Sequence, residues 1–245
     1  MNIRTLFQLF NMEIIWLTKI LLSHLVADFL LQTKKWIKDR KEKHFLSQYL
    51  YYHSFIAGIT TWVLLGWSYW GVALAIFITH TLIDGWKSYK NDTAKYFLID
   101  QSLHVLVIIL CWWSTFYKIN DIGLNWDELN RNPSFWVLTT GFFFLTWPSG
   151  YLIGYLTKKW NNDLNKAESL VNAGMWIGII ERILILILVV KSQYEALGLL
   201  IAAKSIIRFS EKDITERRTE YLLIGTLISI LIAVIIGLFI KVIIL

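Results

Sequence analysis

The chain of 245 residues is poor in the residue types that soluble domains use freely. Charged residues make up 17% of it, against roughly 25% in ordinary soluble domains, and only two prolines interrupt it. The single cysteine, Cys111, excludes an internal disulfide. The sequence contains no phosphate-binding glycine loop, paired-cysteine metal motif or nucleophile elbow. Nucleotide-dependent enzymes and serine hydrolases therefore find no support in its motifs.

Apolar residues are abundant instead: 56% of the chain is hydrophobic and 16% is aromatic. Apolar stretches between polar breaks predict about eight helices of a length suited to a bilayer. We therefore expect an all-α fold, a polytopic transmembrane helical bundle. The expected spans are Ile14–Gln32, Gln48–Trp67, Tyr69–Trp86, Tyr96–Phe116, Ser134–Leu156, Ser169–Val190, Tyr194–Phe209 and Tyr221–Lys241.

Lysine and arginine alternate between the connections of this bundle. The first, third, fifth and seventh connections are basic, and we interpret their charges, Arg40 and Lys87 among them, as topological anchors. Because basic loops stay in the cytoplasm, the alternation predicts that both termini are extracytoplasmic. We expect a multi-pass protein of a bacterial inner membrane. The net charge of +6 then follows from topology, and we expect no nucleic-acid partner.

Ionisable residues gather in the first four predicted helices. Three His/Asp pairs have i,i+4 spacing, which puts both side chains of a pair on one helix face. Ionisable groups within membrane spans are costly and mark functional sites by default. The predicted topology brings the pairs and a fourth histidine to similar depth in the cytoplasmic half of the bilayer. The residues are His24 and Asp28, His80 and Asp84, Asp100 and His104, and His53.

Imidazole and carboxylate ligands suit Zn, Mn or Fe. Four histidines and three aspartates exceed the needs of one tetrahedral site, and they would suit a two-metal centre about 3.5–4 Å across. We therefore predict that the seven residues hold one or two divalent metal ions. Such centres generate hydroxide near neutral pH and stabilise in-line displacement at phosphorus. The alternative is a structural set of His/Asp hydrogen bonds and side chains that reach water.

The second half of the chain carries a different charged set. Glu181 and Arg182 lie in the middle of a predicted helix, and Lys204 and Arg208 share one face of the next. Basic groups there would hold a lipid phosphate or another anion, so we predict that all four bind substrate. The alternative is that they pair within the protein and only lock helices together. We divide the chain into a four-helix His/Asp membrane domain, residues 1–116, and a four-helix C-terminal region, residues 117–245.

Three stretches of the first half resemble a known bacterial membrane family, called domain of unknown function 3307. The likeness covers about half of the chain, and the stretches around Glu181, Lys204 and Glu220 resemble the C-terminal extension of longer members. The resemblance implies a membrane protein but no activity. A weaker likeness is to membrane-bound metal-dependent hydrolases. The stretches that carry the resemblance to domain of unknown function 3307 are His24-Leu-Val-Ala-Asp28-Phe-Leu-Leu-Gln32, His80-Thr-Leu-Ile-Asp84 with Lys87, and Asp100-Gln101-Ser-Leu-His104.

These observations together predict an integral membrane, metal-dependent hydrolase. Its expected substrate is a phosphoester or another anionic, lipid-linked compound at the cytoplasmic half of the membrane, with membrane lipids around it. We expect Asp84, Asp100 and Lys204 to act in catalysis. A metal-ion or proton transporter or channel is one alternative, and a non-catalytic scaffold or sensor is the other. Association with a second copy or a partner protein stays open.

Overall fold

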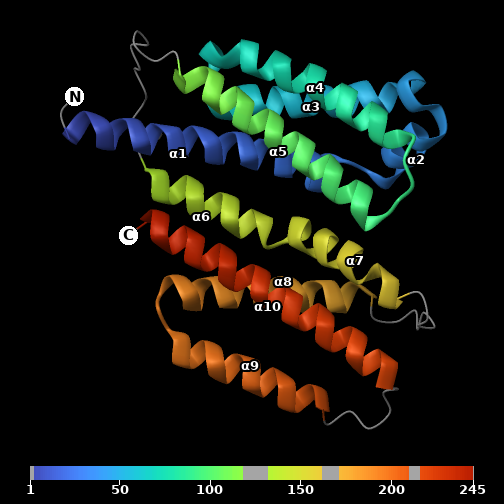
Figure 1. Ribbon diagram of the computed structural model, residues 1–245, viewed down its shortest axis with the longest axis vertical. Helices are drawn as coiled ribbons and strands as arrows, with labels where there is room; N and C mark the ends of the chain where they lie inside the picture. Colours follow the sequence, from blue (N-terminus) through green and yellow to red (C-terminus); the bar gives the residue numbers. More distant parts are fainter. Residues whose placement is uncertain (1–2, 118–131, 162–170, 210–215, 245) are drawn as a thin grey trace. The chain divides into compact units, whose positions relative to one another are not determined.

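A computed structural model of the chain describes residues 3–117, 132–161, 171–209 and 216–244, and these form helices without strands (Figure 1). The all-α class predicted from the apolar pattern is confirmed. The chain divides into two compact units, Met1–Thr140 and Gly141–Leu245. The division falls within α6 (Pro133–Phe144).

Four long helices build the first unit: α1 (Ile3–Val26), α3 (Gln48–Leu65), α4 (Trp70–Ser88) and α5 (Ala94–Tyr117). Both α1 and α4 pack against α3 and against α5, so the four helices close into a bundle. Its centre is apolar. The largest contributions come from Trp16, Ile20, Leu65, Ile76 and Ile108.

The structure departs from the sequence interpretation at the end of α1. A π-helical turn, η1 (Ala27–Leu31), begins next to Asp28, and such turns are frequent at functional sites because they redirect side chains. The basic connection that follows, expected to be a loop, contains a helix, α2 (Lys34–Lys43). A 3₁₀ turn, η2 (His44–Leu46), leads from α2 to α3, and another, η3 (Trp67–Tyr69), joins α3 to α4.

Polar contacts hold α2 against the start of α3. The Thr33 hydroxyl caps α2 by accepting a hydrogen bond from the Trp36 backbone N–H. Lys43 and Ser47 each donate a 2.6 Å hydrogen bond to Asp39, and these bonds hold the pKa of Asp39 below its usual value. The Ser47 bond joins α2 to the residue before α3, and Arg40 lies on the same helix, next to Asp39.

The second unit contains α7 (Trp147–Asn161), α8 (Val171–Val190), α9 (Tyr194–Phe209) and α10 (Glu216–Ile244). In it, α8 contacts α7, α9 and α10, and α10 also packs against α7. The single helix expected over Ser134–Leu156 is wrong, because α6 ends at Phe144 and α7 begins at Trp147. Pro148 explains the break: its ring would clash with the carbonyl four residues earlier, that of Phe144.

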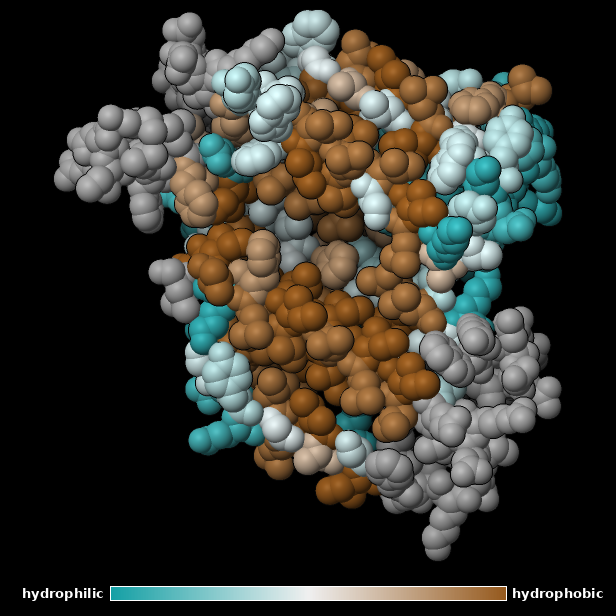
Figure 2. Space-filling model, in the orientation of Figure 1, coloured by the Kyte–Doolittle hydropathy of each residue, from teal (hydrophilic) through white to brown (hydrophobic). Residues whose placement is uncertain are grey.

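Three of the described helical segments are long and apolar enough to cross a membrane: Phe10–Leu31, Ala94–Tyr117 and Tyr221–Ile244. Large apolar side chains are also exposed on other helices, among them Val63 and Leu82. Hydrophobic residues cover much of the visible face of each unit, and hydrophilic ones gather toward the helix ends (Figure 2). These features support a membrane protein.

Candidate metal centre

All seven predicted ligands converge inside the bundle of the first unit. They form three overlapping groups, and within each group one ligand atom per residue lies within 4.8 Å of the others. The bundle achieves this because each of its helices, or the π turn that extends α1, contributes at least one residue. The groups are His24, Asp28, His80 and His104; His53, His80 and Asp84; and Asp84, Asp100 and His104.

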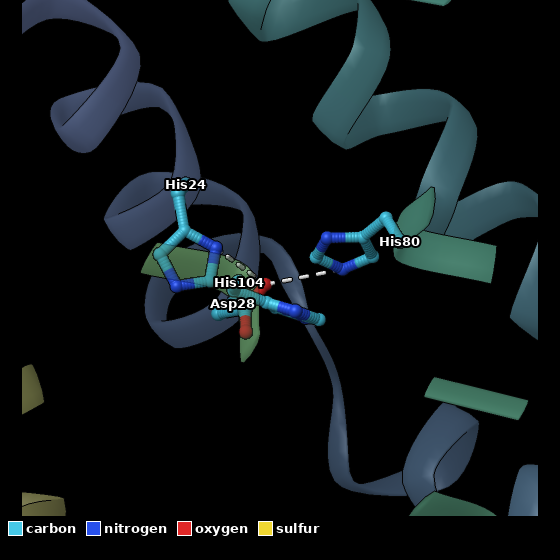
Figure 3. Close-up of side chains that lie close together, drawn as sticks. All are labelled: His24, Asp28, His80 and His104. Carbon is cyan, nitrogen blue, oxygen red and sulfur yellow. Dashed lines mark ion pairs between the residues drawn. The ribbon is translucent and has the colours of Figure 1, made fainter. Parts of the chain in front are cut away.

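The Asp28 carboxylate is surrounded by imidazole rings. Its Oδ1 lies 3.3 Å from His80 Nε2, 3.4 Å from His53 Nε2 and 3.7 Å from His24 Nδ1. Figure 3 shows this carboxylate between His24 and His80, with His104 beside it. Oδ1 is nevertheless buried and accepts no hydrogen bond among the described residues. Three ring nitrogens therefore crowd one oxygen, and none of them makes a well-aligned hydrogen bond to it.

This arrangement fits a shared cation better than a set of direct bonds. Two ligand atoms bound at about 2.0–2.1 Å to a tetrahedral ion lie about 3.3 Å apart, which matches the distances from Asp28 to His80 and His53. Both ring nitrogens of His104 are also buried without a hydrogen-bond partner in the described part of the chain. Leaving such groups unsatisfied is costly. Histidine and aspartate donors suit Zn, Mn or Fe.

Gln101 orients the ligands of this first group. Its Nε2 donates to Asp28 Oδ2 at 3.3 Å and to Asp100 Oδ2 at 3.1 Å. Because the amide nitrogen donates, the amide oxygen accepts from His24 Nε2, at 3.3 Å. A proton on Nε2 leaves His24 Nδ1 unprotonated, with its lone pair toward Asp28. This tautomer is the one that lets Nδ1 bind a metal ion.

Asp84 connects the first group to the remaining ligands. Its Oδ1 lies 3.7 Å from His104 Nε2, and its Oδ2 lies 3.5 Å from His53 Nε2 and 3.8 Å from His80 Nε2. His53 and His80 also share a hydrogen bond of 3.0 Å between their Nε2 atoms. That bond needs a proton on one of the rings, and an ion bound to His80 Nε2 would take its place.

Two cations interpreted as topological anchors lie in the cluster. Arg40 reaches in from α2, is only 8% exposed and forms an ion pair with Asp84. Burial lowers the pKa of Arg40, although Asp28 and Asp100 oppose the shift, and a guanidinium stays charged at neutral pH. Lys87 binds Asp100 Oδ2 at 2.6 Å. Helical spacing relates residues within one helix only. It therefore could not predict that Arg40 on α2 contacts Asp84 on α4.

Charge balance favours one divalent ion over two. The three carboxylates and two cations of the cluster leave one negative charge when the imidazoles are neutral. One divalent ion changes this to one positive charge, and two ions would leave three. Buried charge without compensation is expensive. Since Arg40 and Lys87 pair with Asp84 and Asp100, the group around Asp28 is the favoured site.

The predicted substrate-binding residues belong to the second unit. Glu181 and Lys204 form an ion pair, which is the internal pairing that the sequence left open. Arg182 donates from Nε to the Leu145 carbonyl at 2.8 Å and from Nη2 to the Thr146 carbonyl at 3.0 Å, at the break between α6 and α7. Arg208 lies in α9, but its side chain falls outside the described residues.

Comparison with known families matches residues 16–130 to the family described as a protein of unknown function, DUF3307. This stretch belongs to that family. The DUF3307 region covers α2 to α5, the part of α1 from Trp16 onward and all seven candidate ligands. Its description names no activity, and the likeness to metal-dependent hydrolases gains no support from it. No curated protein and no solved structure matches the chain.

Proposed function

We propose that the DUF3307 region is the metal site of a membrane-embedded hydrolase, with one divalent ion held by His24, Asp28, His80 and His104. One observation carries the proposal: a buried Asp28 oxygen lies 3.3–3.7 Å from three imidazole nitrogens and accepts no hydrogen bond among the described residues. An ion bound there would supply a nucleophile if it took a water as a fifth ligand, whose pKa it would lower to near neutrality.

The proposed substrate is a phosphoester or another anionic, lipid-linked compound. Arg40 and Lys87 support this class, because both bring positive charge to the cluster. Alternating basic connections support eight spans, extracytoplasmic termini and a site in the cytoplasmic half of a bacterial inner membrane.

Within the cluster, Asp84 is our candidate general base, since both of its oxygens lie within 3.8 Å of imidazole nitrogens. Asp100 would act by holding Lys87, with which it pairs. The catalytic role of Lys204 remains a prediction, because Lys204 belongs to the second unit and pairs with Glu181.

Transport through the same bundle is the second candidate. A small cavity next to His80, wide enough for about one water molecule, is lined in part by Ser23 and Thr61, whose hydroxyls share a 2.6 Å hydrogen bond. The apolar centre of the bundle is filled, because Trp16 packs edge-on against Tyr69 and Phe116. This filling favours a closed hydrolytic site over a conducting path.

Metal analysis of the purified full-length protein tests the proposal. We expect one equivalent of Zn, Mn or Fe per chain. Asp28→Asn and His80→Ala should each lower metal affinity by more than the ~10–100-fold typical of changes around the ligands. The matched control is His44→Ala, since His44 bonds Ser88 outside the three ligand groups. A wild-type protein without stoichiometric metal would overturn the metal site.

An assay of turnover distinguishes a hydrolase from a transporter and from a scaffold or sensor with the same metal site. The metal-loaded protein should release p-nitrophenol from p-nitrophenyl phosphate or bis-p-nitrophenyl phosphate, or inorganic phosphate from a lipid phosphate. Asp84→Asn should abolish that release. Full metal occupancy with ion flux into proteoliposomes and no hydrolysis would favour transport, and occupancy with neither would favour a scaffold or sensor.

Substituting Arg40 should raise the metal affinity, whereas substituting a ligand should lower it. Arg40→Met removes a buried positive charge beside the ligands, so it should raise the affinity for a divalent ion by about tenfold or more. The metal-free protein should meanwhile become less stable, because Asp84 loses its partner. Competition with a chromophoric chelator measures the affinity. Lys41→Met is the control, since Lys41 lies on the same helix with an exposed side chain. A lower affinity in Arg40→Met would contradict the cation site.

A further inference from the structure

The second unit contains an open cavity of about 610 Å³ lined by α7, α8, α9 and α10. This volume falls within the range of small-molecule binding sites. Each of the four helices contributes an apolar residue to the wall, and the exposed side chain of Ile177 on α8 marks a rim at the helix flank. The four wall residues are Ile153, Ile177, Leu200 and Leu222.

Glycines leave room inside this cavity. Gly174, Gly178 and Gly225 all line it. A Cβ added at Gly174 would meet nothing within 4 Å, and one added at Gly225 would reach Thr157 only at 3.9 Å. Close helix packing therefore does not require glycine at 174 or 225, whereas a Cβ at Gly178 would come within 3.0 Å of Arg182 Nη1. Their absence of side chains keeps the cavity open.

The charged side chains that line the cavity are Glu181, Arg182 and Lys204. Glu181 and Lys204 neutralise each other in their ion pair. Arg182 is buried and donates to protein oxygens only, including Ser229 Oγ at 3.4 Å. The carbonyls at the end of α6 offset part of the Arg182 charge, but the lining stays positive. Charged groups among membrane helices are functional candidates by default.

We propose that this cavity binds one amphiphile with a single anionic headgroup, whose charge lies at Lys204 and whose chain lies along the apolar wall. The apolar residues on all four helices fit a hydrocarbon chain. The excess positive charge fits one anion, either a carboxylate or a phosphodiester. Hydroxyl groups of Thr157 and Ser229 add polar contacts within the same cavity. The proposal does not depend on the metal centre.

Native mass spectrometry of the full-length protein in detergent tests it with three probes: oleate, dioleoyl phosphatidylglycerol and dioleoyl phosphatidylcholine. We expect one-to-one binding of oleate or phosphatidylglycerol, and the stronger of the two identifies the headgroup. Phosphatidylcholine, which has the same chains and no net charge, should bind at least about tenfold more weakly, because its choline cation offsets the phosphate charge that Lys204 would bind.

Two substitutions of the ion pair should act in opposite directions. Lys204→Met should weaken binding of the anionic probe by about tenfold or more. Glu181→Gln should strengthen it several-fold, because the competing carboxylate is gone. Gly225→Leu should exclude the probe by filling the cavity, whereas Gly198→Leu should not. Gly198 serves as the control because it lies on α9 away from the cavity and a Cβ there meets nothing within 4 Å.

Two results would overturn the proposal. Equal binding of all three lipids by every variant would mean that bulk lipid fills an open cavity. Lower thermal stability of both ion-pair variants with unchanged lipid affinity would mean that the pair is structural only. Lipid binding by His80→Ala should match that of the wild type. The lipid result therefore holds whether or not the first unit binds a metal ion.

Discussion

A saturating divalent ion is expected to raise the temperature at which the metal-free protein unfolds. An ion that binds only the folded state adds about 4 kcal/mol at 1,000 times its dissociation constant. The effect should be large here because the proposed ligands come from α1, the π turn η1, α4 and α5, so one ion cross-links most of the bundle. Unfolding should therefore shift as a cooperative event of the first unit.

Tryptophan fluorescence can follow this transition, because Trp16 is buried in the centre of the same bundle. The protein is measured after chelation and again with Zn²⁺, Mn²⁺ or Fe²⁺. His80→Ala is the matched control, since it removes a ligand that two of the three groups share. An equal shift in this variant would assign the stabilisation to another site. No shift of the wild type with any of the ions would contradict the proposed centre.

Helical spacing and loop charge were enough to predict that the seven His and Asp residues lie together, but not the charge balance around them. The pairs His24/Asp28 and His80/Asp84 lie within ion-pair distance, at 3.7 and 3.8 Å, as i,i+4 geometry requires. The members of the third pair, Asp100 and His104, lie together with Asp84 in one of the three ligand groups. Each pair marks one helix face, and a closed bundle has only one interior toward which such faces can turn.

The features that sequence reasoning missed depend on contacts between elements. Arg40 belongs to a polar helix whose composition resembles that of any basic loop, and only its approach to Asp84 distinguishes it. The π turn at Asp28 has no composition of its own. The break between α6 and α7 could have been found, because Pro148 lies inside the predicted span and disrupts the backbone four residues before it.

Arg40 also changes how the site can be interpreted. In the metal-free state it neutralises Asp84, and Lys87 neutralises Asp100, so these two carboxylates are stable without an ion. Asp28 has the three imidazoles as its neighbours instead. A cluster of seven residues can therefore hold a single ion at one end and an internal ion-pair network at the other, which reconciles the metal and structural readings of the sequence.

Replacing Arg182 with methionine is expected to destabilise the second unit by about 2–4 kcal/mol. The Leu145 carbonyl is fully buried and receives its bond from Arg182. It would become an unsatisfied buried acceptor, since the helix cannot simply continue past Pro148. The Thr146 carbonyl would lose less, because the Ser149 hydroxyl also donates to it, at 3.3 Å.

Thermal unfolding of the detergent-solubilised variants measures this loss. Arg182→Lys keeps the charge and one donating group, so its stability should fall between those of the wild type and Arg182→Met. Lys191→Met, which removes an exposed cation at the far end of α8, should leave the midpoint unchanged. If Arg182→Met unfolds at the wild-type temperature, the guanidinium is not needed at the helix break. Its predicted contact with an anionic substrate would then be the better explanation for a buried arginine in this unit.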